Sequence, residues 1–346
     1  MKLDRGFKIF KRRKPGRIKQ GFLGVCLATA LFTSAAANPT GPTVSHGQVQ
    51  ISPGLQTQIQ QLTDKAIVDW QSFSIGADES VRILQPSLQS VILNRVVGQD
   101  PSNILGTLEA NGNVFLINPN GILFGPHSVV NVGGLVASTL GLSNEDFIAG
   151  NYRFNLEDAS NLAPVINQGT IRISDAGYAV LTGPTVINEG VIVAKVGKVV
   201  LGAGERATLN LDGRDLIHFA LADQVSEGIT LLTPGSVSEA LLDILGVAAN
   251  RRADQLVRNS DGSIHLKNSS GTAVQAGTVR ADGDSGQTAG SILIDSSDLS
   301  LVTPNSVTSA SGRGDNSAGG DVLFLSYMDG NQSSRGFTDI QYGSLL

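Results

Sequence analysis

The stretch that decides the fold reads Leu116-Ile117-Asn118-Pro119-Asn120-Gly121-Ile122-Leu123-Phe124-Gly125. In its centre, Pro119 pre-sets φ for the second position of a turn, and Asn120 and Gly121 tolerate the positive φ that closes it. The sequence therefore predicts a strand, a tight turn and a second strand. Because neither apolar run alternates with polar residues, both faces of these strands should be covered, as in a stacked parallel sheet. For these residues taken alone, the alternative is an ordinary turn between two buried strands.

The composition also favours many short strands. The chain has 346 residues, of which 41 are glycine, and it contains only one tryptophan and four tyrosines. Glycine supplies tight turns, and the accompanying Val, Ile and Thr favour strands over long helices. A length of this size suggests roughly two domains on general grounds, but elongated β architectures run longer as a single unit.

Charge is distributed unevenly along the chain. The first 37 residues hold nine of the 25 Lys and Arg residues and one acidic residue, Asp4, which leaves 16 basic against 29 acidic residues, a net charge of −13, for the remainder. An acidic body is repelled by nucleic-acid phosphates and by anionic lipid. We therefore expect neither a nucleic-acid partner nor stable membrane insertion.

The first 37 residues have the three-part pattern of a secretory signal peptide. A long basic segment runs from Lys2 to Lys19, an apolar run follows from Gly21 to Phe32, and small residues precede a cleavage site after Ala37. The apolar run is about a dozen residues long, whereas a membrane-spanning helix needs about 20. The sequence predicts a secreted or cell-surface protein that passes through the periplasm and loses its signal peptide.

The sole cysteine, Cys26, lies inside this apolar run. Lipidation of Cys26 is disfavoured because Val25 precedes it, where a small residue is wanted. After removal of the signal peptide the chain would contain no cysteine, so a disulfide framework is not expected.

A solenoid needs a cap over its first coil, because exposed strand edges recruit other chains. Period-two alternation at Val49 and Ile51 predicts a first strand, and the segment 66–76 then supplies the chain's only tryptophan. We expect Trp70 and Phe73 to form the amino-terminal cap.

The middle of the sequence contains a series of distinctive motifs. In chain order they are Asp69-Trp70, Phe73, Asn94-Arg95-Val96-Val97-Gly98, Ile104-Leu105-Gly106, Ala110-Asn111-Gly112, Asn118-Pro119-Asn120-Gly121-Ile122, Phe124-Gly125, Leu142 to Phe147, Gly150 to Tyr152, and Phe154. In this order they resemble the secretion domain of filamentous haemagglutinin-type exoproteins of two-partner secretion systems. The resemblance covers residues 44–220 approximately, and the order of its motifs is more specific than any one of them.

The resemblance implies an all-β fold, a right-handed single-stranded parallel β-helix with an amino-terminal cap and short excursions. It also implies that the periplasmic domains of an outer-membrane transporter recognise the module. In that family two motifs are tied to secretion competence, and by position they fall on Asn94, Arg95, Asn118, Pro119, Asn120 and Gly121. From the residues alone, Asn94 and Asn118 could equally satisfy backbone groups at turns or stack between coils, and Arg95 could pair with a nearby acid.

Internal repetition supports a solenoid independently. The segment 166–171 returns at 187–192, a step of 21 residues, and 177–181 returns at 197–201, a step of 20. Periods in this range are typical of coils that stack on their neighbours to bury an apolar side. At about 4.8 Å per coil, ten coils would form a rod of about 50 Å.

The sequence divides the mature chain into three parts. Residues 38–235 form the secretion domain, residues 236–275 form an excursion with a short helix capped by Ser238, and residues 276–346 form further coils with a step near 30. Glycine- and aspartate-rich corners at 282–286 and 313–316 could suggest calcium, but they fit neither the EF-hand loop nor the nonapeptide repeat. Since related exoproteins usually continue for more repeats, we expect either a minimal member or part of a longer gene product.

The leading functional prediction is a secreted, non-enzymatic exoprotein of adhesin or haemagglutinin type. It would bind its outer-membrane transporter and also a host-cell glycan or protein receptor, without a cofactor or metal. The four histidines, at 46, 127, 218 and 265, lack ligand spacing. The alternative is a β-helix lyase or hydrolase acting on polysaccharide, which would need paired carboxylates, or carboxylates with Lys or Arg, on neighbouring coils. The two clear repeats show no acidic or basic ladder. A toxin carrier would need a carboxy-terminal effector that this sequence does not contain.

Overall fold

The computed structural model describes most of the chain after the expected signal peptide. The described residues are 38–158, 161–209, 217–218, 255–258, 264–267, 271–297, 299–314, 317–326 and 337–340. The predicted signal peptide, its cleavage after Ala37 and the predicted helix after Ser238 lie outside them.

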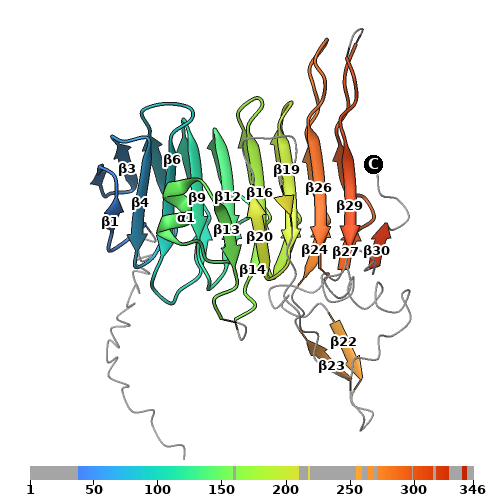
Figure 1. Ribbon diagram of the computed structural model, residues 1–346, viewed down its shortest axis with the longest axis horizontal. Coiled ribbons are helices and arrows are strands. Elements are labelled where there is room, and N and C mark those ends of the chain that lie inside the picture. The colour runs from blue at the N-terminus through green and yellow to red at the C-terminus, as the bar shows by residue number, and fades with distance from the viewer. Residues whose placement is uncertain are drawn as a thin grey trace, which may run out of the picture. The chain divides into compact units, whose positions relative to one another are not determined.

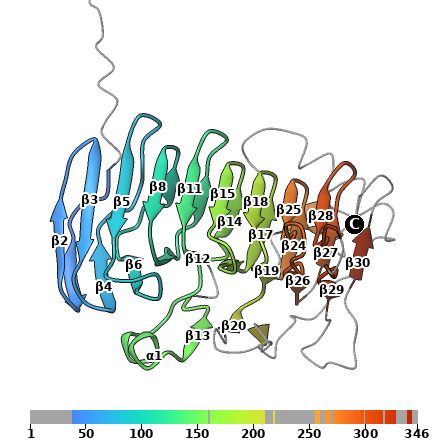
Figure 2. The ribbon, with the colours of Figure 1, turned by 90° about the horizontal axis from the view of Figure 1, so that it is seen from above.

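Three long sheets contain most of the strands, and from β5 on the chain visits them in turn, so that each circuit adds one strand to each sheet (Figures 1 and 2). Apart from the first two strands of the chain, all partners in these sheets are parallel. Sheet 1 contains β1 (Thr43–His46), β4 (Lys65–Trp70), β6 (Val91–Val96), β9 (Asn113–Ile117), β12 (Gly134–Ser138), β16 (Tyr178–Gly183), β19 (Lys198–Ala203), β26 (Ser291–Ser296) and β29 (Val322–Ser326). Sheet 2 contains β2 (Val49–Ser52), β3 (Gln56–Gln61), β5 (Ser80–Leu84), β8 (Thr107–Ala110), β11 (Val129–Val132), β15 (Thr170–Ile173), β18 (Val191–Ala194), β25 (Thr278–Arg280) and β28 (Val307–Ser309). Sheet 3 contains β7 (Ser102–Ile104), β10 (Ile122–Phe124), β14 (Pro164–Asn167), β17 (Thr185–Asn188), β24 (Thr272–Gln275), β27 (Leu299–Val302) and β30 (Phe337–Ile340). The predicted parallel β-helix is confirmed.

The core is a column of apolar side chains enclosed by the three sheets. In sheet 1 one such column runs through Ile92, Val114, Leu135, Ala179 and Val199, which lie in register on successive strands and are fully buried. Burying a large aliphatic side chain contributes about 1.5–3 kcal/mol. Because each coil is too thin to enclose these side chains alone, stacking is what makes the core.

Glycines form a column where the chain passes from sheet 2 to sheet 1. A Cβ atom at Gly290 would overlap the carbonyl oxygen of Gly197, and one at Gly320 would overlap the carbonyl oxygen of Gly290. Successive corners therefore approach so closely that only glycine fits, which explains part of the high glycine content.

At the amino-terminal end, two antiparallel strands cover the edges of the first coil. Strand β1 pairs with β4, and β2 pairs with β3. Trp70 and Phe73, which the sequence predicts to form the cap, are buried in the interior of this coil and pack edge to face, with ring centroids 5.4 Å apart. Strands β1 and β2 cover the sheet edges beside them, which limits recruitment of other chains.

An excursion covers the outer face of sheet 1. After β12 the chain forms α1 (Asn144–Ala149) and β13 (Tyr152–Asn155), and β13 pairs with β20 (Arg206–Leu209), which pairs with β21 (Ile217–His218). Rings of Phe147 and Tyr152 pack on Phe115, with centroids 5.7 and 5.0 Å away. Figure 2 shows α1 and β13 on the opposite side of the solenoid from sheet 2.

Local capping explains where α1 begins and ends. The Ser143 side chain accepts a hydrogen bond from the amide of Asp146, and Gly150 adopts the left-handed conformation after the last turn. The Lys65 ammonium donates to the carbonyl of Ile148 at 2.8 Å. The helix is thereby fixed to the first coil of the solenoid.

The chain leaves the three sheets earlier than the sequence division suggests. After β19 it enters β20, and it returns to sheet 3 in β24, which pairs with β17. Between them lies the antiparallel pair β22 (Gln255–Arg258) and β23 (Ile264–Lys267). Strand β24 belongs to the stretch that the sequence assigns to the excursion, 236–275. Among the described residues, no helix is long and apolar enough to cross a membrane.

Candidate functional site

The predicted turn lies at the corner between β9 in sheet 1 and β10 in sheet 3. The Gly121 amide donates to the carbonyl of Asn118 at 3.1 Å, and the Asn120 amide donates to Asn118 Oδ1 at 2.9 Å. Gly121 has φ near 118°, a region that side chains other than hydrogen rarely permit. The Asn-Pro-Asn-Gly sequence therefore closes this turn through both its backbone and its first side chain.

The Asn118 side chain is fully buried and fastens the turn to the coil before it. Its amide nitrogen donates to the carbonyl of Asp100 and to the hydroxyl of Ser102, both at 3.0 Å. Because these partners lead into β7, Asn118 fixes how the preceding coil enters sheet 3.

Asn120 joins the two predicted secretion motifs directly. Its side-chain nitrogen donates to the carbonyl of Gly98, 2.9 Å away, at the end of the Asn94–Gly98 motif. The carbonyl of Pro119 accepts a hydrogen bond from Asn161 at 3.0 Å, from the segment that leads to the next coil. Motifs that are 20 residues apart in the sequence thus form one corner spanning three coils.

Asn94 lies inside the solenoid. Its side-chain oxygen accepts a hydrogen bond from Trp70 Nε1 at 3.1 Å, and its nitrogen lies 3.5 Å from the carbonyl of Phe115. Since Asn94 is fully buried, this bond satisfies the polar edge of the indole ring within the core. The sequence alternative placed Asn94 at a turn, where it would satisfy backbone groups or stack between coils, whereas the structure places it within β6 with the Trp70 side chain as its partner.

Arg95 points outward and connects four segments of the chain. Its guanidinium contacts the Asp69 carboxylate at 3.1 Å and the carbonyl of Leu142 at 2.7 Å. The Asp69 carboxylate also accepts a hydrogen bond from the hydroxyl of Ser45 in β1. The Arg95 and Asp69 side chains are only 21% and 18% exposed. Arg95 therefore links the first two coils to the start of the excursion, and its ion pair with Asp69 agrees with the alternative that it pairs with a nearby acid.

Only part of this corner is accessible from outside. Pro119 and Asn120 are half-buried, and Val97, next to Gly98, is 53% exposed. A molecule approaching the folded domain would therefore contact Val97, Pro119 and Asn120, whereas Asn94 and Asn118 act from within.

Comparison with known protein families shows to which family the chain belongs. The sequence model of the family described as "TPS secretion domain" matches residues 35–321, most of the chain. The chain belongs to this family. The matched range includes the predicted divisions near 235 and 275. Members of the family are secreted exoproteins of two-partner systems.

Two curated relatives come from Haemophilus influenzae, and both are described as heme/hemopexin-binding proteins. One is 37% identical over 208 residues, which is 58% of this chain and 23% of the relative, and the other is 43% identical over 96 residues, 28% and 10% respectively. The alignments thus span less than a quarter of the length of these relatives. The crystal structure of the HMW1 secretion domain from Haemophilus influenzae has a TM-score of 0.56 and 24% identity, covering 89% of this chain and 83% of that one. This likeness shows that the secretion domain shares the fold.

The secretion domain also contains a buried amide ladder that sequence reasoning missed. Asn167 donates to the side-chain oxygen of Asn188, which donates to that of Gln275, both at 2.8 Å. All three side chains are fully buried in sheet 3. The repeat at 166–171 and 187–192 was the available signal for the first pair, but Gln275 follows only after an excursion.

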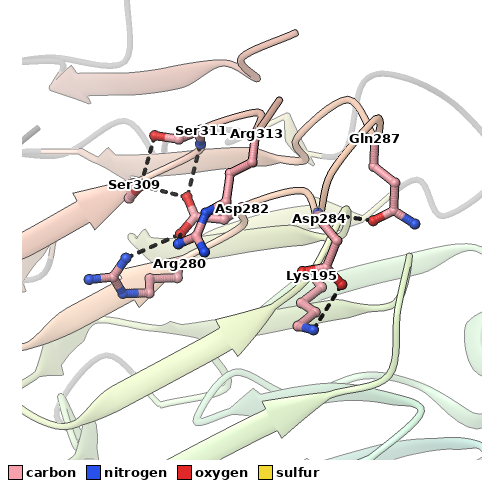
Figure 3. Close-up of polar contacts among 8 residues, drawn as sticks. All are labelled: Lys195, Arg280, Asp282, Asp284, Gln287, Ser309, Ser311 and Arg313. Carbon is pink, nitrogen blue, oxygen red and sulfur yellow. Dashed lines mark hydrogen bonds and ion pairs between the residues drawn. The ribbon is translucent and has the colours of Figure 1, made fainter. Parts of the chain in front are cut away.

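The corners that could have suggested calcium hold ion pairs instead. Figure 3 shows the Asp282 carboxylate facing Arg280, at 3.1 Å, while Lys195 contacts Asp284 at 3.0 Å. Burial raises the pKa of Asp282, but hydrogen bonds from Ser309 and the Ser311 amide, together with Arg280, outweigh it and leave the pKa below its ordinary value. Within the described residues no cluster of three or more His, Cys, Asp or Glu side chains could hold a metal ion.

Proposed function

We propose that the periplasmic domains of an outer-membrane transporter recognise this secretion domain and pass it to the cell surface. The corner that joins the Asn94–Gly98 and Asn118–Gly121 motifs would serve this export. The single observation that carries the proposal is the hydrogen bond from Asn120 to Gly98, because it unites both motifs in one structure with a partly exposed surface. Family membership supplies the transporter class.

Stacking suggests how export could become irreversible. A coil that has emerged from a pore can bury its apolar side only against its neighbours. The cap strands, the Asn94–Trp70 bond and the Arg95 contacts all lie in the first coils. We propose that these coils fold first outside the cell and oppose backsliding, and that the absence of cysteine after the predicted cleavage site keeps the translocating chain free of cross-links.

The exported rod would carry a binding function rather than a catalytic one. The relatives are described by what they bind, heme or hemopexin, and their names describe no enzyme. We propose that the exported protein binds a host glycan or a host protein.

Secretion from a Gram-negative host, with and without a cognate two-partner transporter, tests this function. Protein should reach the medium only when the transporter is present. Asn120→Ala should reduce secretion, and the buried Asn118→Ala should reduce it together with the stability of the domain. Asn131→Ala, an exposed asparagine in sheet 2, is the matched control. Release without a transporter, or full secretion of both corner variants, would contradict the proposal.

A further inference from the structure

Sheet 2 has an outer face that stays open to solvent over successive coils. The excursion covers the outer face of sheet 1. On sheet 3 the outward side chains at Ile187, Val274 and Leu301 are 4%, 1% and 0% exposed, whereas Asn103, in register with them on β7, is exposed. In sheet 2, by contrast, apolar residues point inward and polar residues point outward. The outer face of sheet 2 is therefore available to a large partner over successive coils.

A column of five planar polar side chains runs along this face. They are in register on five successive strands, β3, β5, β8, β11 and β15, and all five are exposed. None of them makes a side-chain hydrogen bond or an ion pair with another described residue. We refer to them as the planar column: Gln58, Arg82, Glu109, Asn131 and Arg172.

The geometry of the planar column fits an extended polymer. Adjacent parallel strands lie about 4.8 Å apart, so the column spans about 19 Å in a straight line. Amide, guanidinium and carboxylate groups each offer two hydrogen-bonding atoms in one plane, which suits the neighbouring hydroxyl groups of a sugar ring. Small ligands bind in concave pockets, whereas a flat face with a regular repeat suits a chain that lies along it.

The residues beside the planar column leave room for such a chain. The positions two residues earlier on the same strands hold Gln56, Ser80, Thr107, Val129 and Thr170, which are on the same face because strand side chains alternate. Apart from Gln56, at the amino-terminal end of the column, they are small β-branched or hydroxyl side chains. The planar groups therefore project beyond neighbouring short side chains, so that a ligand can approach them.

The charges of the planar column indicate which class of polymer it would bind. Arg82 and Arg172 are three strands apart, about 14 Å, and Glu109 lies between them, so the planar column has a net charge of +1 on a body with a net charge of −13. Widely spaced cations suit a polymer with one charge every few units. DNA has one charge about every 1.7 Å and would be repelled by the acidic body.

We propose that the outer face of sheet 2 binds an extended acidic polysaccharide along the planar column. Arg82 and Arg172 would pair with its carboxylate or sulfate groups, while Gln58 and Asn131 would hydrogen-bond its hydroxyl groups. This site is on a different sheet from the β9–β10 corner and does not depend on recognition by a transporter.

The test measures binding of the purified chain at low salt, by calorimetry, to hyaluronate, which has one carboxylate in every two sugar units, and to polygalacturonate, which has one in every unit. The double variant Arg82→Gln/Arg172→Gln should lower the affinity for the acidic chain that binds by at least tenfold, because two charge-assisted contacts are lost. Glu109→Gln should raise that affinity, since it removes a repulsive charge from the middle of the column. Arg153→Gln, an exposed arginine of the excursion, should leave it unchanged.

Four outcomes would each overturn the inference. These are no binding of either acidic chain, an equal loss with Arg153→Gln, equally tight binding of a neutral β-linked oligosaccharide, and equal competition by single-stranded DNA. Since all the substituted side chains are exposed, the circular dichroism spectrum and urea midpoint of each variant should match the unsubstituted chain and so exclude misfolding. The binding assay does not involve secretion. Failure of the polysaccharide proposal can therefore be distinguished from failure of the export proposal.

Discussion

Replacing Asn118 by alanine should destabilise the first coils by an amount that the structure allows us to estimate. The substitution removes two hydrogen bonds donated to Asp100 and Ser102 and the acceptor for the Asn120 amide, all between 2.9 and 3.0 Å. A net contribution of about 1 kcal/mol for each neutral hydrogen bond gives a loss of about 2–4 kcal/mol, since buried partners are left unsatisfied. Asn118 is fully buried, so water cannot replace the lost amide without opening the corner.

Urea unfolding followed by far-ultraviolet circular dichroism would measure this loss. Because coils of a solenoid need not unfold together, amide hydrogen exchange over residues 98–121 should be recorded in parallel, and exchange there should accelerate most. The matched control is Asn131→Ala, which removes an exposed asparagine without described partners and should change stability by less than about 0.5 kcal/mol. If Asn118→Ala were no more destabilising than this control, the assignment of the turn as a fastening between coils would be refuted.

Three further predictions concern other parts of the solenoid. Asn188→Ala should cost about 2–3 kcal/mol in urea unfolding, because it interrupts the amide ladder and removes the partner of one buried polar atom on each of Asn167 and Gln275; a cost below about 0.5 kcal/mol would contradict the ladder. Gly290→Ala should destabilise by about 1–3 kcal/mol or more, because the new Cβ overlaps a backbone oxygen of the preceding coil; thermal unfolding measures this, and Gly286→Ala, where no atom lies close but φ is positive, separates overlap from backbone strain. Asp282→Asn should lower the urea midpoint at pH 7, and the difference from the unsubstituted chain should shrink as the pH falls below about 4. The pKa of Asp282 is lowered on folding, so its stabilising contribution is complete above the unfolded pKa and is lost as the pH falls through the folded one; a pH-independent difference would contradict this.

Some features of this protein could be predicted from short stretches of its sequence. The Asn118–Gly121 turn, the apolar runs on either side and the 20- to 21-residue repeats predicted stacked parallel strands, because turn chemistry and side-chain burial depend on neighbouring residues. The order of motifs then identified the family. These inferences needed only the type of each residue and its short-range spacing.

The tertiary structure decided which residues meet across coils. Consecutive members of the planar column are separated by 24, 27, 22 and 41 residues, and the ladder partners Asn188 and Gln275 by 87. No fixed period predicts these neighbours, because corners and excursions differ in length while strand pairing restores the register. For the same reason Arg95 meets the carbonyl of Leu142 and Asn94 meets Trp70 only in the folded chain. The sequence determined that coils would form and stack, whereas the length of each connection determined which side chains the stacking brings together.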